Sequence, residues 1–315
     1  MSILKKALAA AVVAGLVSTV GVVPANAAPK NQARSVAQPD WLEANLDNPK
    51  VRIIEVSTEP GLYERGHIKN AIKFVWHTDL VDTVNRDIIN AKNFSKLVQK
   101  AGISDDTTVV LYGDKNNWFA AWGAWIFNIY GQKDVRVLDG GRVKWEKDGR
   151  ALTTAVPSFP AGNFVATKAD KALRATLIND VLPVAKKRVK ADLVDIRGAD
   201  EFNGKIFAAP GFQELAVRAG HIPGAINVPW GANVNADGTF KTVAELKKLY
   251  ADKGIDGKQN IITYCRIGER SSLTWFVLSE ILGYNVKNYD GSWTEYGNSV
   301  GVPIVNNAGT IWGAA

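Results

Sequence analysis

The chain of 315 residues contains a single cysteine, Cys265. One cysteine cannot form an internal disulfide, so disulfide bonds within the chain are excluded. No basic stripe interleaved with aromatic residues is present and the formal net charge of +7 is modest, which makes nucleic acid a poor candidate partner. No cysteine lies near the N-terminus, so a lipid anchor on cysteine is excluded as well. The mild positive excess would help a small anion to approach.

The N-terminus has the organisation of a secretory signal peptide. Lys5 and Lys6 precede an apolar run over residues 7–23, and the sequence Ala-Asn-Ala at 25–27 offers a small-x-small cleavage site. We expect cleavage directly after this site, so that residues 1–27 are removed and the protein is exported, either periplasmic or secreted. The run is short and ends in a cleavage site, which disfavours a retained anchor and predicts no stable membrane insertion afterwards.

Cys265 lies between a segment with strand character and one with helix character. Residues 261–264 are apolar and partly β-branched, which predicts a buried strand. Ser271 and Ser272 are good helix-capping residues, and the apolar-rich segment 273–282 after them is long enough for a helix. The intervening loop would lie where backbone N–H groups and the positive end of the helix dipole converge.

A thiol in this position should ionise more easily than a free one. Arg266 and Arg270 act in the same direction, because nearby cations lower the pKa of a thiol. A lone thiol outside the cytosol is a liability unless it is used, which also favours a reactive Cys265. This interpretation requires a sulfur that solvent can reach and N–H groups that point toward it. The alternative is a small buried hydrophobic residue, the usual fate of a lone cysteine.

The chain repeats itself with nearly constant offsets, which indicates a duplication because chance matches would not keep their spacing. The matched pairs are residues 66–68 and 220–222, 101–103 and 253–255, 109–112 and 261–264, and 137–140 and 288–291. The alignment places Gly113 opposite Cys265 and Asp114 opposite Arg266. The first copy therefore lacks both the nucleophile and the cationic loop, and we expect its role to be structural.

Each copy alternates short apolar segments with amphipathic ones. In the second copy, residues 181–189 and 243–252 have the pattern of helices, and residues 191–196 and 286–289 that of strands. The alternation predicts an α/β fold of two tandem domains, each with a mostly parallel central sheet and helices on both faces. Ligands of such sheets bind beyond the carboxyl ends of the strands, where Cys265 would lie.

The domain boundaries follow from composition and from the repeat. We expect a polar lead-in at 28–39, a non-catalytic N-terminal domain at 40–152, a surface linker at 153–175, a catalytic C-terminal domain at 176–305 and a loosely held tail at 306–315. The second copy is longer than the first around residues 203–218, which predicts a loop near the mouth of the site. We expect the protein to be a monomer.

The sequence Cys-Arg-Ile-Gly-Glu-Arg at 265–270 resembles the active-site loop of the rhodaneses, the thiosulfate sulfurtransferases. Their loop reads Cys-Arg-x-Gly-x, followed by a polar or basic residue before the helix. The resemblance extends over almost the whole mature chain and is closest to the exported, two-domain members. It implies tandem rhodanese-like domains, an inactive N-terminal copy, and transfer of the outer sulfur of thiosulfate to cyanide or another thiophilic acceptor.

Under this resemblance Cys265 attacks the outer sulfur, sulfite leaves, and the cysteine carries a persulfide until an acceptor such as cyanide or a thiol removes the sulfur. A guanidinium presents its donors in a planar fork that suits the sulfonate of the donor. The substrate-binding residues would be Arg266, Ile267, Gly268, Glu269 and Arg270. We expect the side chain of Glu269 to point to solvent, and we expect no cofactor, no metal and no histidine base.

Three alternatives are open. The 3-mercaptopyruvate sulfurtransferases resemble the chain overall, but their loop reads Cys-Gly-Ser/Thr-Gly, and Arg266 in place of that glycine favours thiosulfate. Cysteine phosphatases and arsenate reductases need five residues between cysteine and arginine, whereas Ser271 occupies that position and Arg270 comes one residue early. The third alternative is an exported carrier that hands its persulfide sulfur to a protein partner.

Two histidines are assigned by their place in the repeat, two residues by their position at the end of a strand, and one further residue departs from the family. His67 and His221 occupy equivalent positions in both copies, so we expect them to be structural. Asp195 and Arg197 form either a pair that steadies the loop or a simple surface pair. Some two-domain rhodaneses have an arginine for the sulfonate near the position of Glu201, so the acid here leaves donor binding to the loop arginines.

Overall fold

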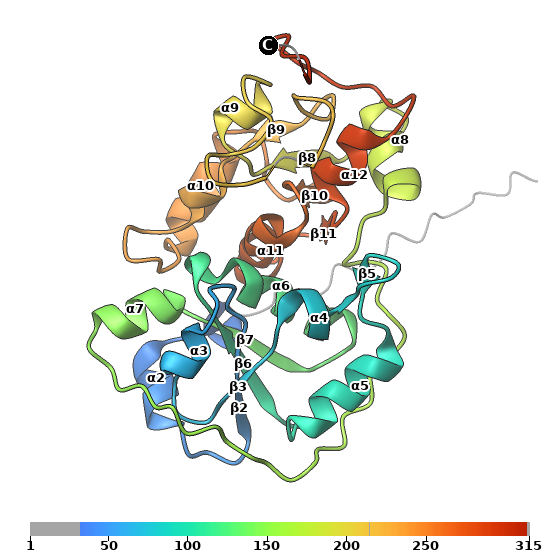
Figure 1. Cartoon of the computed structure of the whole chain (residues 1–315). Helices are drawn as coiled ribbons and strands as arrows, with labels where there is room; N and C mark the ends of the chain where they lie inside the picture. The colour runs from blue at the N-terminus through green and yellow to red at the C-terminus, as the bar shows by residue number, and fades with distance from the viewer. Residues whose placement is uncertain (1–31, 214, 314–315) are drawn as a thin grey trace, which may run out of the picture.

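The computed structural model describes residues 32–213 and 215–313. The expected signal peptide lies outside these residues. Within them the chain forms two α/β domains, one above the other in Figure 1, each built on a parallel sheet. No helix of the described part is long and apolar enough to cross a membrane.

The two sheets are parallel throughout. The first has the strand order β1-β7-β6-β2-β3 and the second the order β11-β10-β8-β9. The strands of the first are β1 (Val36–Ala37), β2 (Val51–Glu55), β3 (Ala71–Lys73), β6 (Thr108–Tyr112) and β7 (Asp134–Leu138). Those of the second are β8 (Asp192–Asp195), β9 (Ile226–Asn227), β10 (Ile261–Tyr264) and β11 (Val286–Asn288). A separate antiparallel pair consists of β4 (Val81–Asp82) and β5 (Asp87–Ile88).

Helices separate most of the strands. The first domain contains α1 (Gln32–Ser35), α2 (Pro39–Ala44), α3 (Leu62–Arg65), α4 (Trp76–Asp79), α5 (Ala91–Lys100), α6 (Trp118–Ile129) and α7 (Gly141–Lys147). The second contains α8 (Leu182–Ala185), α9 (Ala199–Phe202), α10 (Val243–Ala251), α11 (Glu269–Trp275) and α12 (Ser292–Asn298). Short 3₁₀ turns cover Lys115–Asn117 and Trp230–Asn233, and π-helical segments cover Leu177–Val181 and Phe276–Ile281.

Helices cover both faces of each sheet, as predicted. On β6, Val109 and Leu111 pack in the same core cluster as residues of α5 and α6. Val110 and Tyr112 point the other way and pack in the cluster that contains residues of α2, α3 and α7. This alternation follows from the period of two along a strand. The second domain repeats it around β10, with α10 and α11 on one face and α8 and α12 on the other.

The two domains meet through α6 and α11, which follow the equivalent strands β6 and β10 (Figure 1). All residues of α11 are buried, and α6 is buried on every side. A helix that lies between its own sheet and another helix has no face left for water, which explains why α6 is apolar around most of its circumference. Their side chains belong to one continuous core cluster, so the loop before α11 lies at the domain junction.

Several elements differ from the sequence-based expectations. The strand at 261–264 is confirmed, and the helix expected at 243–252 is α10. The helix expected at 181–189 ends early, because Lys187 has a φ of 56° in the left-handed region. The tail is not loose as far as the described residues extend, since the amide of Ala308 donates to the carbonyl of Asn203 at 3.0 Å.

Candidate active site

The loop that joins β10 to α11 folds around the sulfur of Cys265. Gly268 has a φ of 101°, and a Cβ atom there would lie 2.8 Å from the Asp290 backbone, so this position requires glycine. The Gly268 N–H donates to Sγ of Cys265 at 3.1 Å. The backbone N–H of Cys265 donates to the hydroxyl of Ser292 at 3.1 Å. One of the two conditions for a nucleophile, an N–H directed at the sulfur, is therefore met.

The helix after the cysteine begins at Glu269, earlier than predicted. Ser271 and Ser272 lie in its first turn, and their hydroxyls donate to the carbonyl of Gly268 at 2.9 and 2.8 Å. The prediction that these serines precede the helix is wrong, because the left-handed Gly268 already turns the chain into it. This shift of the helix start brings the side chain of Glu269 into the site.

The sulfur is enclosed in this conformation. Cys265 is 0% exposed, and burial raises the pKa of its thiol. The charge of Glu269 raises the thiol pKa further, whereas that of Arg270 lowers it. The expectation of an easily ionised thiol is wrong here, because the loss of hydration outweighs the attraction of the guanidinium. The second condition, a sulfur that solvent can reach, requires the surrounding groups to move.

Glu269 lies inside the site, so the expectation that it points to solvent is wrong. The residue is 2% exposed, and its Oε2 lies 3.8 Å from Sγ of Cys265. Side chains in a helix tilt toward its N-terminus, which directs a first-turn residue back at the loop. Burial raises the pKa of the Glu269 carboxyl, while the charges of Arg270, Arg266 and Arg86 lower it.

Arg270 is paired with an acid from another part of the chain. Its two terminal nitrogens donate to the two carboxylate oxygens of Glu201 at 3.2 and 3.1 Å, and both residues are buried. Such a bidentate pair is the geometry that a guanidinium would also offer to a sulfonate. In this conformation both terminal nitrogens of Arg270, which we predicted to bind a substrate, therefore already donate to Glu201.

The longer loop of the second domain lies over the site, where it was predicted. Arg266 donates to the backbone carbonyl of Gln213 at 2.9 Å. The ring of Phe212 lies 5.5 Å from the guanidinium of Arg266 and 5.8 Å from that of Arg270. The ring of Phe212 also lies 6.4 Å from that of Trp118, which belongs to the first domain. We call Phe212 and Gln213 the cover of the site.

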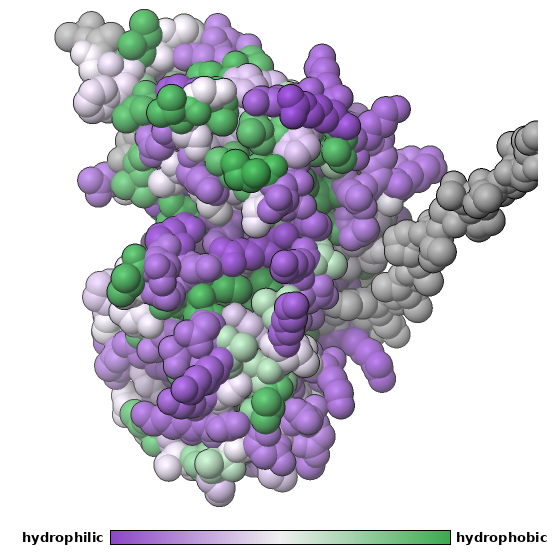
Figure 2. Space-filling view, turned by 90° about the vertical axis from the view of Figure 1, so that its right-hand side faces the viewer, coloured by the Kyte–Doolittle hydropathy of each residue, from purple (hydrophilic) through white to green (hydrophobic). Residues whose placement is uncertain are grey.

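The first domain also reaches the loop through Arg86, in the turn between β4 and β5. Its Nη2 donates to the carbonyl of Ile267 at 2.9 Å, and its Nη1 lies 3.5 Å from a carboxylate oxygen of Asp290. A cavity of about 430 Å³ opens beside this contact and is lined by Arg86, Arg174 and Asp290 among others. Hydrophilic residues gather around the waist between the two domains in Figure 2. Nothing in the sequence pattern indicated this contribution, which depends on how the domains pack.

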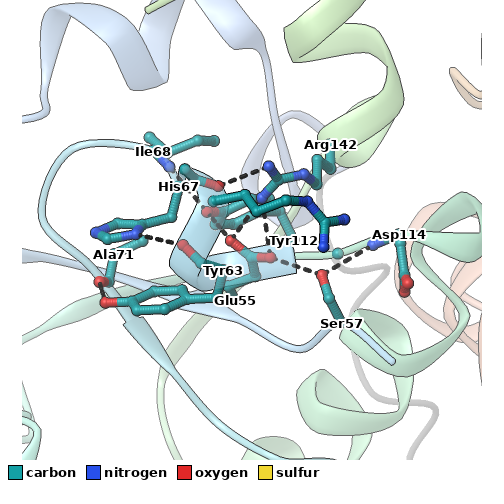
Figure 3. Close-up of polar contacts among 12 residues, drawn as sticks. Glu55, Ser57, Tyr63, His67, Ile68, Ala71, Tyr112, Asp114 and Arg142 are labelled. Carbon is teal, nitrogen blue, oxygen red and sulfur yellow. Dashed lines mark hydrogen bonds and ion pairs between the residues drawn. The ribbon is translucent and has the colours of Figure 1, made fainter. Parts of the chain in front are cut away.

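The pair of Asp195 and Arg197 is buried, so the alternative of a surface pair is wrong. Arg197 donates to Asp195 at 2.6 Å. The first domain contains an equivalent pair, in which Arg142 donates to Glu55 at 3.0 Å (Figure 3). Each guanidinium also donates to the glycine carbonyl just before the histidine of its own domain, at 2.7 and 2.6 Å. The two copies therefore stabilise the same part of the fold with arginines from different positions.

The histidines have equivalent surroundings in both domains. His67 stacks on Tyr63 with ring centroids 3.8 Å apart, and His221 stacks on Phe202 at 3.6 Å. Each Nδ1 lies within hydrogen-bond distance of the carbonyl of its stacking partner, at 2.9 and 2.7 Å. This arrangement is the structural role that we expected. In the described part of the chain, no cluster of His, Cys, Asp and Glu could hold a metal ion.

The first domain has no room for a side chain at the position equivalent to the cysteine. A Cβ atom on Gly113 would lie 2.3 Å from the carbonyl oxygen of Val56. The next residue, Asp114, accepts a hydrogen bond from the amide of Glu59 at 2.9 Å. This loop is therefore organised around its own carboxylate, and the first domain lacks the nucleophile.

Comparison with known proteins identifies the family. The model of the rhodanese-like domain matches residues 38–148 and 182–299. The chain is 54% identical over 267 residues to the "Putative thiosulfate sulfurtransferase" of Mycobacterium tuberculosis, which covers 84% of this chain and 95% of the relative. It is 52% identical over 269 residues to the "Sulfur carrier protein TtuD" of Thermus thermophilus, covering 84% of this chain and 94% of the relative.

Solved structures give the same result. The 3-mercaptopyruvate sulfurtransferase SseA of Escherichia coli superposes with a TM-score of 0.69 at 27% identity, covering 82% of this chain and 98% of that one. The protein YnjE superposes with a TM-score of 0.74 at 26% identity, covering 86% and 68%. The chain therefore belongs to the rhodanese family, with two rhodanese-like domains, and its general activity is that of a sulfurtransferase.

Proposed function

We propose that the protein is a thiosulfate sulfurtransferase. It moves the outer sulfur of thiosulfate to cyanide or another thiophilic acceptor through a persulfide on Cys265, and it releases sulfite. The observation that carries this proposal is the placement of the single thiol in a loop whose Gly268 N–H donates to Sγ at 3.1 Å. A preorganised N–H donor stabilises the negative sulfur of a thiolate or persulfide. The name of the M. tuberculosis relative supports thiosulfate as the donor.

Because the sulfur is enclosed, we infer that the cover moves before the donor reaches it. The cover contacts the loop arginines through one hydrogen bond from Arg266 and through the ring of Phe212. A hydrogen bond and an exposed cation–π contact together stabilise the closed position of the cover by about 2 kcal/mol. The binding free energy of a dianion can offset the loss of these contacts. Opening would free donors of Arg266 for the sulfonate, while Arg270 stays paired with Glu201.

Intact mass after incubation with thiosulfate tests this function. We expect a gain of one sulfur atom per chain, its removal by cyanide, and no gain in Cys265→Ser. Because Cys265 is the only cysteine of the chain, the added sulfur needs no further assignment. A wild-type protein that gains no mass from thiosulfate would contradict the proposal.

Two alternatives are favoured by specific relatives. The name of the Thermus relative supports a sulfur carrier that loads once and then passes its sulfur to a protein. The E. coli structure supports 3-mercaptopyruvate as the donor. Steady-state thiocyanate formation with each donor separates the three functions. Turnover with thiosulfate supports our proposal, turnover with mercaptopyruvate alone supports the second donor, and stoichiometric loading without turnover supports a carrier.

We also propose that the protein acts outside the cytosol after removal of residues 1–27. The proposal rests on the charged start, the apolar run and the small-x-small site in the sequence. N-terminal sequencing of the mature protein tests it, and a chain that still begins with Met1 after expression in its own cell type would contradict it.

A further inference from the structure

Sulfur transfer through Cys265 alone gives no role to the buried carboxyl beside the reacting sulfur. Oε2 of Glu269 lies 3.8 Å from Sγ of Cys265, and neither side chain is in contact with bulk solvent. Arg270, the adjacent cation, is committed to Glu201 through both terminal nitrogens. Among the described residues, the carboxyl of Glu269 accepts from its own backbone N–H and lies within hydrogen-bonding distance of the sulfur of Cys265.

Two acidic groups in one dehydrated site do not both ionise readily. Burial favours the neutral form of each, and a negative charge on one raises the pKa of the other. The cations that face them are Arg270, Arg266 and Arg86, of which the first is matched by Glu201 and the last lies beside Asp290. The thiol and the carboxyl therefore titrate as a coupled pair rather than as separate groups.

We propose that Cys265 and Glu269 form a dyad that shares one proton, with Glu269 as the proton acceptor for the thiol. This inference rests on the proposed sulfur transfer at the same site. It makes Glu269 a catalytic residue, because its carboxyl touches the reacting sulfur. A positioned base is needed here since the enclosed thiol is not ionised in advance.

The proton and electron balance closes within the site. The S–H proton passes to the Glu269 carboxylate, and the thiolate attacks the outer sulfur of thiosulfate. A sulfur–sulfur bond forms to Cys265, the bond to the sulfonate sulfur breaks, and its electron pair leaves with sulfite. The loaded state contains an anionic persulfide beside a neutral carboxyl. When cyanide takes the outer sulfur as thiocyanate, the cysteine leaves as a thiolate and recovers the proton from Glu269.

The resting state and the loaded state therefore carry the same total charge. In one state the carboxylate is negative and the sulfur is protonated, and in the other the sulfur is negative and the carboxyl is protonated. In a site enclosed from water, this equality lowers the free-energy cost of loading, because no additional charge has to be buried when sulfur is loaded. The neutral carboxyl can also donate a hydrogen bond to the persulfide.

Infrared difference spectroscopy of the wild-type protein tests the dyad directly. Loading with thiosulfate should produce the carbonyl stretch of a protonated carboxyl, and cyanide should remove it. The band should be missing in Glu269→Gln. Intact mass of the same samples reports sulfur loading independently. A mass gain without a carboxyl band would overturn the dyad and leave the sulfurtransferase function intact, whereas the absence of a mass gain would count against the function.

A second measurement needs no substrate. The ultraviolet absorbance of the thiolate, with Cys265→Ser as the blank, gives the titration of the single cysteine. We expect it to shift to lower pH in Glu269→Gln, because the carboxylate no longer repels the thiolate. Glu269→Asp retains an acid and should keep part of the wild-type behaviour. An unchanged thiol titration in Glu269→Gln would overturn the dyad whatever the donor is.

The pH profile of single-turnover loading distinguishes a proton acceptor from a merely structural residue. Wild type should load at a rate that changes little with pH around neutrality, because the proton moves within the site. In Glu269→Gln the rate should fall about tenfold for each pH unit below the thiol pKa, since only the ionised fraction reacts. A flat profile in the variant would contradict the proposal.

Discussion

Arg270 and Glu201 form a buried bidentate pair, with both nitrogen–oxygen distances close to 3.1 Å. The two residues lie far apart in the sequence and meet because α9 and the start of α11 border the same site. The pair fixes the direction of the guanidinium that follows the catalytic loop, and it cancels a positive charge that would otherwise face the donor anion. Donor affinity in this protein should therefore depend on whether Arg270 keeps its acidic partner.

The first prediction concerns this pair. Glu201→Gln removes the acid that is paired directly with the buried Arg270 and should lower the free energy of unfolding by about 3 kcal/mol. The same change gives Arg270 donors for the sulfonate, so KM for thiosulfate should fall. Urea denaturation and initial rates measure the two effects. Glu64→Gln, which removes an exposed pair with Lys73, is the control and should change stability by about 0.5 kcal/mol or less. Equal stability of both variants would contradict the prediction.

The second prediction concerns the cover. Phe212→Ala removes the ring that lies against Arg266 and Arg270, so the sulfur should react faster with iodoacetamide, by about threefold to tenfold if about 1 kcal/mol of closure is lost. Phe212 is 40% exposed, and little stability should be lost. Val217→Ala in the same loop, 51% exposed, is the matched control. If both variants react like wild type, this ring does not limit access.

The third prediction concerns the inert copy. Gly113→Ala places a Cβ atom 2.3 Å from the carbonyl oxygen of Val56, and the backbone must move to accept it. We expect a loss of about 1–3 kcal/mol in the free energy of unfolding, measured by urea denaturation. A Cβ atom on Gly231 would have nothing within 4 Å, so Gly231→Ala should be nearly neutral. A Gly113→Ala variant as stable as this control would contradict the prediction, because it would show that the backbone of the loop moves at little cost in free energy.

The fourth prediction follows from the thiol. Burial raises the pKa of Cys265 in the folded protein, so the folded state holds the proton more tightly than the unfolded state. This contribution to stability is fully present below the ordinary thiol pKa of about 8.5 and is lost as the pH rises toward the folded-state value. Wild type should therefore lose stability relative to Cys265→Ser as the pH rises above about 8.5. Urea titrations of both proteins over this range measure it, and parallel curves would contradict the raised pKa.

The sequence was sufficient to predict the parallel architecture and the duplication. The strand at 261–264 had both the apolar run and the position in the repeat, and the copies kept their spacing because the folds are equivalent. Gly113 opposite the cysteine indicated a copy without the nucleophile, and its close approach to Val56 now explains why no side chain occurs there. The place of the longer loop could be predicted because insertions in such sheets gather at the carboxyl ends of the strands.

The ionisation state of the thiol could not be predicted in the same way. The sequence shows that two arginines follow Cys265. It does not show that Glu201 forms an ion pair with one of them or that the ring of Phe212 lies against both. Desolvation is a property of the packed site, and here it outweighs the local charges. The direction of Glu269 depended on the first residue of α11, and a helix boundary is the least certain feature of a sequence pattern.

The close packing of α6 on α11 has a consequence for the protein as a whole. Trp122 and Trp125 lie in the core cluster shared by the two domains. A fragment containing either domain alone would therefore expose a broad apolar surface to water. The half without the cysteine therefore acts as a subunit that is covalently tethered to the half that contains it. The two copies thus share one interface, as the subunits of a dimer do, although they belong to a single polypeptide.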